Sequence, residues 1–398
     1  MDGQLLERFA ELIVGFGANV QPGQVVAIGT EPGKEDLTRA IAAEAYRRGA
    51  RFVDVMSFDP YVKRARILHA DPETLEYVPP WYGERVLALG EHRAARIGLT
   101  GPGAPGLLDD LDPVLAGRDQ LPWLKESAVV VNERTTNWTA VPCPTGPWAS
   151  QVHPELDPAT ALERLWEEVA HVCRVDEADP VAAWEERMAT LLRASDTLTE
   201  RRFDALHFRG PGTDLRVGLL PGSQWLAARF ETIEGIVHMP NIPSEETFTA
   251  PDPERVDGVV RATKPLALSG TIVRGLEVRF EAGRAVSIEA ETGAETLRTI
   301  TGRDEGAARL GEVALVDAQG RIGALETVFY DTLLDENAAS HIAFGRAYGF
   351  SVDEPDRERA NLSDIHIDFM IGGDDVEVDA ITGAGDAVPV LRAGAWQV

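Results

Sequence analysis

The spacing of apolar residues changes character near residue 200, and this change most constrains the fold. Before it, short apolar runs alternate with amphipathic stretches, whereas after it short strand-like runs follow one another with turn signals between them. The first pattern is typical of a parallel sheet with helices, and the second of antiparallel pairing. We therefore expect an N-terminal α/β domain over residues 1–195 and an α+β domain over residues 196–398, each large enough to bury a core.

The first half contains a clear strand–helix–strand pattern. Residues 25–29 and 52–55 are predicted strands, and the amphipathic stretch 34–48, which ends at Gly49, is predicted to be the helix between them. Such a unit of about 30 residues places its two strands side by side and parallel. The same reasoning predicts helices over 5–17, 161–175 and 181–194, and two further buried strands over 95–99 and 127–131.

The second half is predicted to be rich in short antiparallel strands. A break at Glu281-Ala282-Gly283 indicates a hairpin loop between two of them. The predicted strands of this half cover residues 205–209, 215–219, 276–280 and 285–290.

Charge and cysteine content exclude several classes of protein. Among 398 residues, 65 are Asp or Glu and 38 are Lys or Arg, which gives a formal net charge of −27. Such a surface repels nucleic-acid phosphates and does not adhere to acidic membranes. Only Cys143 and Cys173 are present, too few for a disulfide framework or a cysteine-based zinc site. With no basic leader and no apolar run of about 18 residues, we expect a cytoplasmic protein.

The segment Gly101-Pro-Gly-Ala-Pro-Gly106 follows a predicted strand and matches a dinucleotide-binding glycine pattern. Its two prolines remove backbone N–H groups where a pyrophosphate needs donors. Little room for a helix follows, because Asp112-Pro113 comes soon after. We therefore predict a loop here and no dinucleotide cofactor.

Four separated segments after residue 235 carry side chains suited to divalent metal ions. Carboxylates and imidazoles bind hard and borderline ions, and several of them occur here in apolar surroundings. Any one of these acids alone would usually be a solvated surface charge, so the conjunction is what indicates a metal site. The segments are 238–249, 310–316, 335–348 and 361–372, and the candidate ligands are Glu245, Glu246, Glu312, Glu336, His341, His366 and Asp368.

Local geometry favours convergence of some of these groups. His366 and Asp368 alternate with apolar residues, so on a strand they share one face, about 6–7 Å apart. On a helix, His341 and Tyr348 would point the same way, about 10 Å apart along the axis, and Glu336 would reach His341 only from the helix start. Glu312 beside an apolar run would be costly to bury unless it is paired or metal-bound.

The donor set leaves more than one chemistry open. Several acids with only two histidines suit two divalent ions better than one zinc held by three histidines. A single Fe(II) held by His341, His366 and Asp368, as in an oxygenase, is the alternative; it needs none of the extra acids. A binding protein without activity on the same scaffold is a third possibility.

The four segments resemble the M29 family of metallopeptidases, the aminopeptidase T or thermophilic aminopeptidase group. Asp335-Glu-Asn-Ala-Ala-Ser-His341 and His366-Ile-Asp-Phe-Met-Ile-Gly372 are the most specific parts of the resemblance. It extends over the whole chain, from Val20-Gln-Pro-Gly-Gln-Val-Val through Gly212-Thr-Asp-Leu215 and Asn241-Ile-Pro-Ser-Glu-Glu246 to Leu391-Arg-Ala-Gly-Ala-Trp396.

The resemblance implies an aminopeptidase that hydrolyses the N-terminal bond of short peptides. It implies a homodimer with an α/β N-terminal domain, a C-terminal catalytic domain and two divalent ions, zinc, cobalt or manganese. Glu312 would bridge the ions, Tyr348 would hydrogen-bond the reacting carbonyl, and Glu246 or Glu336 would carry the proton. Some ring-cleaving dioxygenases look related to this family, which is why the Fe(II) alternative is kept. The implied metal ligands are Glu246, Glu312, Glu336, His341, His366 and Asp368.

Overall fold

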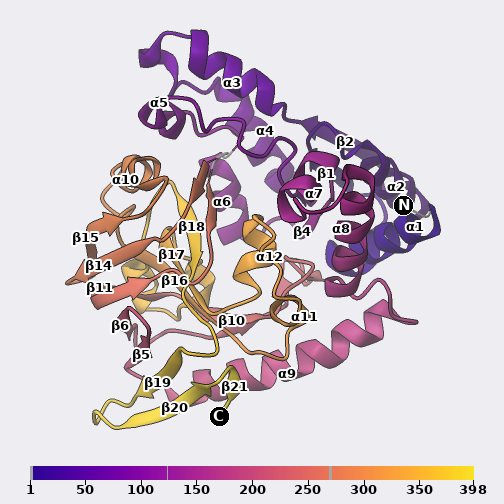
Figure 1. Cartoon of the computed structure of the whole chain (residues 1–398). Coiled ribbons are helices and arrows are strands. Elements are labelled where there is room, and N and C mark those ends of the chain that lie inside the picture. Colours follow the sequence, from indigo (N-terminus) through magenta and orange to yellow (C-terminus); the bar gives the residue numbers. More distant parts are fainter. Residues whose placement is uncertain (1–2, 123, 269–270) are drawn as a thin grey trace. The chain divides into compact units, whose positions relative to one another are not determined.

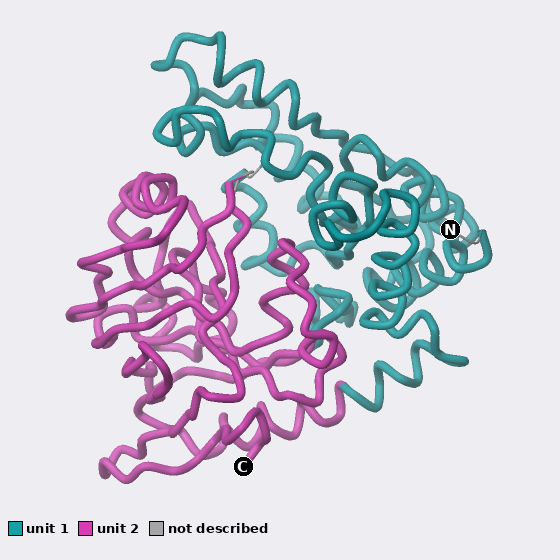
Figure 2. Tube along the Cα trace, in the orientation of Figure 1, with its two compact units in different colours: residues 1–187, 228–244 teal, residues 188–227, 245–398 magenta. Residues whose placement is uncertain are grey.

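The computed structural model (Figure 1) describes residues 3–122, 124–268 and 271–398. The chain forms two compact units, unit 1 from Met1–Arg187 with Ala228–Ser244 and unit 2 from Met188–Ala227 with Glu245–Val398 (Figure 2). The first boundary falls inside helix α9 (Pro180–Arg201). Residues 228–244 return to unit 1 after the chain has entered unit 2.

Unit 1 is built on a parallel sheet with strand order β2-β1-β3-β4. Helix α2 (Glu35–Arg47) connects β1 to its parallel neighbour β2, which confirms the strand–helix–strand pattern. Gly49 follows that helix with φ of +87°, a conformation that costs glycine little. The strands are β1 (Val25–Thr30), β2 (Phe52–Ser57), β3 (Ala95–Thr100) and β4 (Trp138–Pro142).

The other predicted helices of this unit form, with shifted ends. The predicted helix over 5–17 is α1, which continues as a π-helical turn over Ile13–Gly17. Helix α8 begins at Pro158 because the Asp157 carboxylate accepts hydrogen bonds from the Ala159 and Thr160 N–H groups. The helices besides α2 and α9 are α1 (Gly3–Leu12), α3 (Pro60–His69), α4 (Pro80–Glu91), α5 (Pro113–Arg118), α6 (Lys125–Asn132), α7 (Gly146–Val152) and α8 (Pro158–Val172).

The predicted strand over residues 127–131 is wrong. These residues lie in helix α6, and the strand that pairs with β3 is β4. A short run of valines has no periodicity that separates a buried strand from a helix. The run became a helix with Ala128 and Val130 buried.

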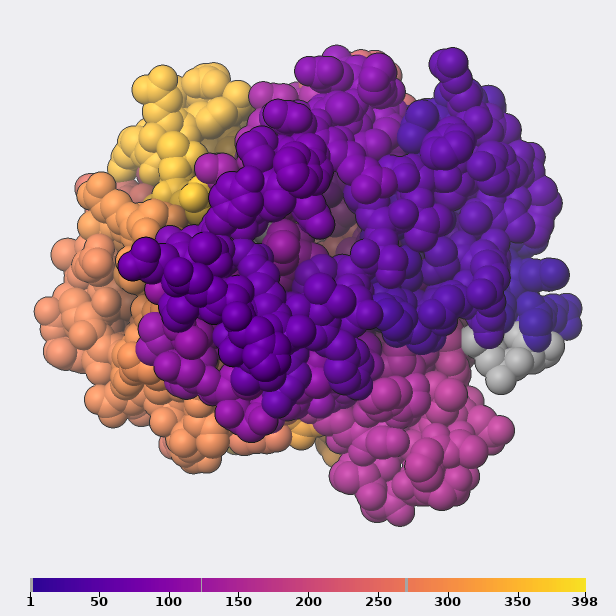
Figure 3. Space-filling view, turned by 90° about the horizontal axis from the view of Figure 1, so that it is seen from above, coloured from indigo at the N-terminus to yellow at the C-terminus, as the bar shows by residue number. Residues whose placement is uncertain are grey.

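Turns and bends follow β3 from Gly101 to Asp112, and α5 begins only at Pro113, so the glycine-rich segment is a loop, as predicted. Unit 1 also exposes large apolar side chains on α3 and α4, namely Tyr61, Val62, Trp81 and Tyr82. In Figure 3 the part of the chain that contains α3 and α4 is coloured indigo to purple.

Unit 2 contains two larger antiparallel sheets. The eight-stranded sheet has the order β15-β14-β11-β6-β5-β19-β20-β21 and includes all four strands predicted for this half, with the hairpin at residues 281–284. Its strands are β5 (Ala205–Gly210), β6 (Thr213–Leu219), β11 (Pro251–Arg261), β14 (Glu277–Glu281), β15 (Arg284–Glu289), β19 (Glu377–Ile381), β20 (Ala387–Arg392) and β21 (Ala395–Trp396).

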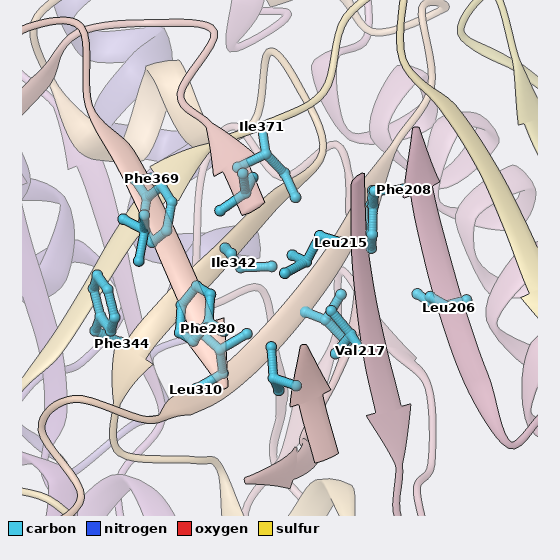
Figure 4. Packing of buried hydrophobic residues seen from close by; sticks show 14 of the residues in the cluster. Leu206, Phe208, Leu215, Val217, Phe280, Leu310, Ile342, Phe344, Phe369 and Ile371 are labelled. Carbon is cyan, nitrogen blue, oxygen red and sulfur yellow. The ribbon is translucent and has the colours of Figure 1, made fainter. Parts of the chain in front are cut away.

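The five-stranded sheet has the order β18-β17-β16-β10-β7 and carries the segments of interest. One of its faces packs into the core: Phe344 lies 5.2 Å from Phe369 and 5.8 Å from Phe280 between ring centroids (Figure 4). The strands are β7 (Leu226–Ala227), β10 (Glu246–Thr249), β16 (Leu310–Val316), β17 (His341–Gly345) and β18 (His366–Met370).

Short elements complete the described chain. Among its residues, no helix combines the length and the apolar composition that crossing a membrane requires. The short elements are helices α10 (Ala294–Thr301), α11 (Arg321–Ala324) and α12 (Thr332–Glu336), and strands β8 (Phe230–Glu231), β9 (Val237–His238), β12 (Leu266–Leu268) and β13 (Thr271–Val273).

Candidate metal centre

One face of the five-stranded sheet carries five of the candidate side chains. Directly opposed residues of an antiparallel pair share a face. His341 opposes Ala314, two residues from Glu312, and Asp368 opposes Ala343, two residues from His341. The pairing of Glu246 with Val316 and of His366 with Gly345 puts these two on the same face. As predicted, His366 and Asp368 alternate with core residues, here Ile367 and Phe369.

An extra residue in β16 places Leu310 and Glu312, which are two residues apart, on opposite faces of the sheet. Leu310 pairs with Phe344, whereas Glu312 pairs with Ala343, so two steps along β16 match one step along β17. Such a bulge rotates the chain, and Leu310 enters the core while Glu312 does not. Gly311 permits the bulge, because a Cβ there would lie 2.2 Å from the Gly345 carbonyl oxygen.

Two groups of potential ligands form on this face. Glu246, Glu312 and His341 make the first group, and Glu312, His366 and Asp368 make the second; within each, the ligand atoms lie within 4.8 Å of one another. Glu312 belongs to both groups. His341 Nε2 is 3.0 Å from Glu246 Oε2 and 3.5 Å from Glu312 Oε1.

The second group uses the other oxygen of Glu312. His366 Nε2 lies 3.7 Å from Glu312 Oε2 and 3.3 Å from Asp368 Oδ1. The two oxygens of one carboxylate therefore face two different imidazoles, which is the arrangement of a group that can bind two ions at once.

Backbone carbonyls fix the orientation of both imidazoles. His341 Nδ1 is 2.9 Å from the Glu336 carbonyl oxygen, and His366 Nδ1 is 2.7 Å from that of Arg346. A carbonyl oxygen only accepts, so each Nδ1 carries the proton and donates. In a neutral ring each Nε2 would then aim its lone pair at carboxylate oxygens, which also only accept. A cation between them, or a second proton on each ring, resolves this conflict.

Burial and mutual charge shift the pKa values of these groups in opposite directions. Burial raises the pKa of Glu312 to about 7, although its contact with His341 opposes the shift. Burial disfavours the charged form of His366, but Asp368 and Glu312 outweigh it and raise the pKa of His366 to about 10. Burial is likewise outweighed for Asp368, whose pKa is lowered by His366.

Glu336 lies at the end of α12, in the last turn of a helix and not at its start as the spacing argument required. It belongs to neither of the two groups found among the described residues. It is buried, and burial together with the charges of Asp368 and Glu246 raises the pKa of Glu336 well above its usual value. Glu336 therefore sits in the same electrostatic environment as the two groups.

The helical arrangement considered for His341 and Tyr348 does not form, because His341 begins strand β17 and Tyr348 follows it in a loop. The Tyr348 ring is nonetheless near the site: its centroid is 5.5 Å from that of His366 and 5.7 Å from that of Phe248. Burial and then the surrounding carboxylates raise the pKa of Tyr348 well above its usual value, so its hydroxyl keeps its proton.

Of the two neighbouring acids on which spacing could not decide, Glu246 is the one beside His341. Glu245 is fully buried, and its backbone N–H donates to Asn337 Oδ1. Reasoning from the sequence missed Asn337 and Phe248. Asn337 lies inside the most specific segment of the resemblance, but an amide that follows two acids gives no signal by itself.

The donor set fits divalent cations. Apart from His341 Nε2, the buried Glu246 Oε2 has no partner within the described part of the chain. A carboxylate oxygen buried in this way is costly unless a cation satisfies it. Carboxylates with imidazoles are donors that suit zinc, cobalt and manganese.

Comparisons with known proteins agree with this chemistry. Residues 2–396 match the family model described as "Thermophilic metalloprotease (M29)". The chain is 44% identical to aminopeptidase T of Thermus thermophilus over 99% of this chain and 98% of that protein. It is 36% identical to aminopeptidase 2 of Geobacillus stearothermophilus over 98% of this chain and 97% of that protein. The solved structure of wild-type AmpT from Thermus thermophilus superposes with a TM-score of 0.88 at 42% identity, covering 99% of both chains.

The match and the donor set together define a metal-dependent hydrolase of peptide bonds. The chain belongs to the M29 family of metalloproteases. This confirms the family expected from the four segments, and the agreement with AmpT confirms the expected fold class, an α/β N-terminal part followed by an α+β C-terminal part.

Binding of a divalent cation to the metal-free protein should release protons. A metal-bound imidazole is neutral, whereas His366, with a pKa of about 10, is protonated at pH 7. Affinity should therefore rise with pH from about 6 to 9. Calorimetric titration with Co²⁺ in buffers of different ionisation enthalpy measures the release. Replacing the half-buried His207 of β5 by alanine leaves the proton count unchanged; proton uptake by the unaltered protein would contradict the expectation.

Proposed function

We propose that this protein is an aminopeptidase that removes the N-terminal residue of short peptides with the help of two divalent ions. The proposal rests mainly on Glu312, which belongs to both groups of potential ligands and whose two oxygens face separate imidazoles. The relatives named aminopeptidase T and aminopeptidase 2 support the same activity. Catalysis is assigned to the C-terminal domain predicted over 196–398, which contains every proposed site residue.

Charge balance supports two ions and not one. The site holds four carboxylates, which contribute −4 when ionised, and two imidazoles, which are neutral as ligands. Two divalent ions cancel that charge, whereas one would leave −2 in a buried site. The residues proposed to hold zinc, cobalt or manganese are Glu246, Glu312, Glu336, His341, His366 and Asp368.

The ions would supply a water of nearly neutral pKa and polarise the scissile carbonyl. The chain's own residues then have separate tasks. The Tyr348 hydroxyl keeps its proton because burial and the surrounding carboxylates raise its pKa. It can therefore donate a hydrogen bond to the carbonyl oxygen as negative charge develops there.

We assign to Glu336 the transfer of a proton from the attacking water, although Glu246 has the same chemistry. Among the residues proposed to hold the ions, Glu336 would be the one least committed to them, because it belongs to neither of the two ligand groups. Its raised pKa in the metal-free protein shows that its carboxyl can also hold a proton. From there the proton passes to the nitrogen of the departing amine. Carboxylate oxygens of this face that are not bound to an ion can accept hydrogen bonds from the free ammonium group of a peptide N-terminus, which is the reason to expect cleavage at that end.

The Fe(II) oxygenase remains a weaker alternative. It needs His341, His366 and Asp368 around one ion, and that trio is not among the groups found in the described residues. Each imidazole is instead paired with a different oxygen of Glu312. The named relatives give the oxygenase no support.

Replacing the shared carboxylate should abolish activity. In E312Q the amide cannot bridge two cations, so kcat on leucine amide should fall at least about a thousandfold, and the metal content should fall below two ions per chain. Steady-state kinetics and elemental analysis measure both. E168Q, which alters a buried glutamate of unit 1 that contacts His153 and Arg164, is the matched control. Near-normal turnover by E312Q would show that the site is misassigned.

Removing the tyrosine hydroxyl should slow the reaction without removing metal. Y348F loses a donor to the developing oxyanion, which lowers kcat by about tenfold to a thousandfold. Kinetics with metal analysis check this. The control is Y46F, which removes a hydroxyl of unit 1 that accepts a hydrogen bond from the Val53 N–H. An unchanged kcat in Y348F would end the oxyanion role.

We also propose that the protein acts as a cytoplasmic homodimer, as its family resemblance implies. The apolar side chains that α3 and α4 expose, among them Tyr61 and Trp81, support association, because burying them would remove apolar area from water. Light scattering should give twice the mass of one chain. The mass of a single chain at micromolar concentration would contradict this proposal.

A further inference from the structure

Asn337, the residue directly after α12, is completely buried and joins two parts of the site. Its Oδ1 accepts a hydrogen bond of 2.6 Å from the Glu245 backbone N–H. Its Nδ2 donates to the Leu333 carbonyl oxygen at 2.9 Å and lies 3.4 Å from Glu336 Oε1. One side chain therefore links the start of β10 to the end of α12.

Both ends of this link lead directly to candidate ligands. Glu245 immediately precedes Glu246, the first residue of β10, so the hydrogen bond to Asn337 fixes the backbone from which the Glu246 carboxylate extends. On the other side, the carbonyl oxygen of Glu336 accepts from His341 Nδ1 at 2.9 Å. Asn337 thus holds the backbone next to Glu246, and its neighbour Glu336 orients the ring of His341.

The second ligand group has different supports. His366 and Asp368 lie on β18, and His366 Nδ1 is oriented by the Arg346 carbonyl oxygen. No hydrogen bond of Asn337 that the structure describes reaches either residue. A change at Asn337 should therefore act on one group and spare the other.

We propose that Asn337 is a positioning residue that sets the separation of Glu246 from His341 and so determines the metal affinity of the first group. The inference rests on the two-ion site proposed above. Without the amide, the Glu245 N–H is buried without an acceptor, and the start of β10 moves to find one. Mutation of a residue that supports a metal ligand in this way commonly lowers metal affinity by about tenfold to a hundredfold.

The test is calorimetric titration of the metal-stripped full-length protein with Co²⁺ alone. In N337A, one of the two binding steps should weaken by about tenfold to a hundredfold while the other stays within about threefold of the unaltered protein. The kcat of N337A should recover toward normal as Co²⁺ is raised, with KM unchanged. A role confined to folding would change neither step selectively.

N137A is the matched control, because Asn137 is a buried asparagine of unit 1 whose Nδ2 donates to the Ala18 carbonyl oxygen at 2.6 Å. It should lower the melting temperature and leave both Co²⁺ steps unchanged. If N337A does not fold, N337L takes its place. Its two methyl groups occupy the positions of the amide oxygen and nitrogen and give the Glu245 N–H no acceptor, so N337L should also weaken one step only.

The outcomes separate this inference from the function on which it rests. If the unaltered protein binds fewer than two ions or lacks peptidase activity, the proposed function fails. If the unaltered protein binds two ions and a folded N337A or N337L binds both with unchanged affinity, or loses both equally, the positioning role is overturned. Selective weakening of one step, with activity restored by excess Co²⁺, supports it.

Discussion

The repulsion among buried carboxylates is the constraint on which the rest of unit 2 depends. Glu246, Glu312, Glu336 and Asp368 share one electrostatic environment with only His341 and His366 to offset them. Burial of like charges is unfavourable unless cations or protons compensate. The scaffold must therefore hold these groups together against their own repulsion, and its architecture is best understood as the means of doing so.

The five-stranded sheet does this by placing the aromatic core on one face and the acids and imidazoles on the other. One face is anchored by large apolar side chains such as Phe344 and Phe369, which are fully buried. The other face carries the acids and imidazoles, whose backbone is held by the same ladder of hydrogen bonds. The tightly packed apolar face thus fixes the spacing of the side chains on the polar face. The free energy gained by burying the apolar side chains offsets the cost of bringing the carboxylates together. The bulge at Gly311 lets Leu310 and Glu312, two residues apart, point to opposite faces.

Backbone groups and one amide complete the arrangement. Carbonyl oxygens of Glu336 and Arg346 select the protonated nitrogen of each imidazole, so that both Nε2 atoms face carboxylates. Such outer contacts fix ring orientation before any ion arrives, which lowers the cost of assembling the site. In the same way, Asn337 is proposed to hold the backbone from which the Glu246 carboxylate of β10 extends.

The sequence by itself determined the two kinds of fold, the strand–helix–strand unit around α2, and the shared face of His366 and Asp368, because these follow from local periodicity. It also supplied the candidate acids and histidines. It could not decide that residues 127–131 are a helix, that His341 begins a strand, or which of Glu245 and Glu246 faces His341. Those outcomes were decided only by the tertiary structure, because they depend on packing and on pairing between strands distant in the chain. A shift of one residue moves a side chain to the opposite face of a sheet, and local patterns contain no information about such a shift.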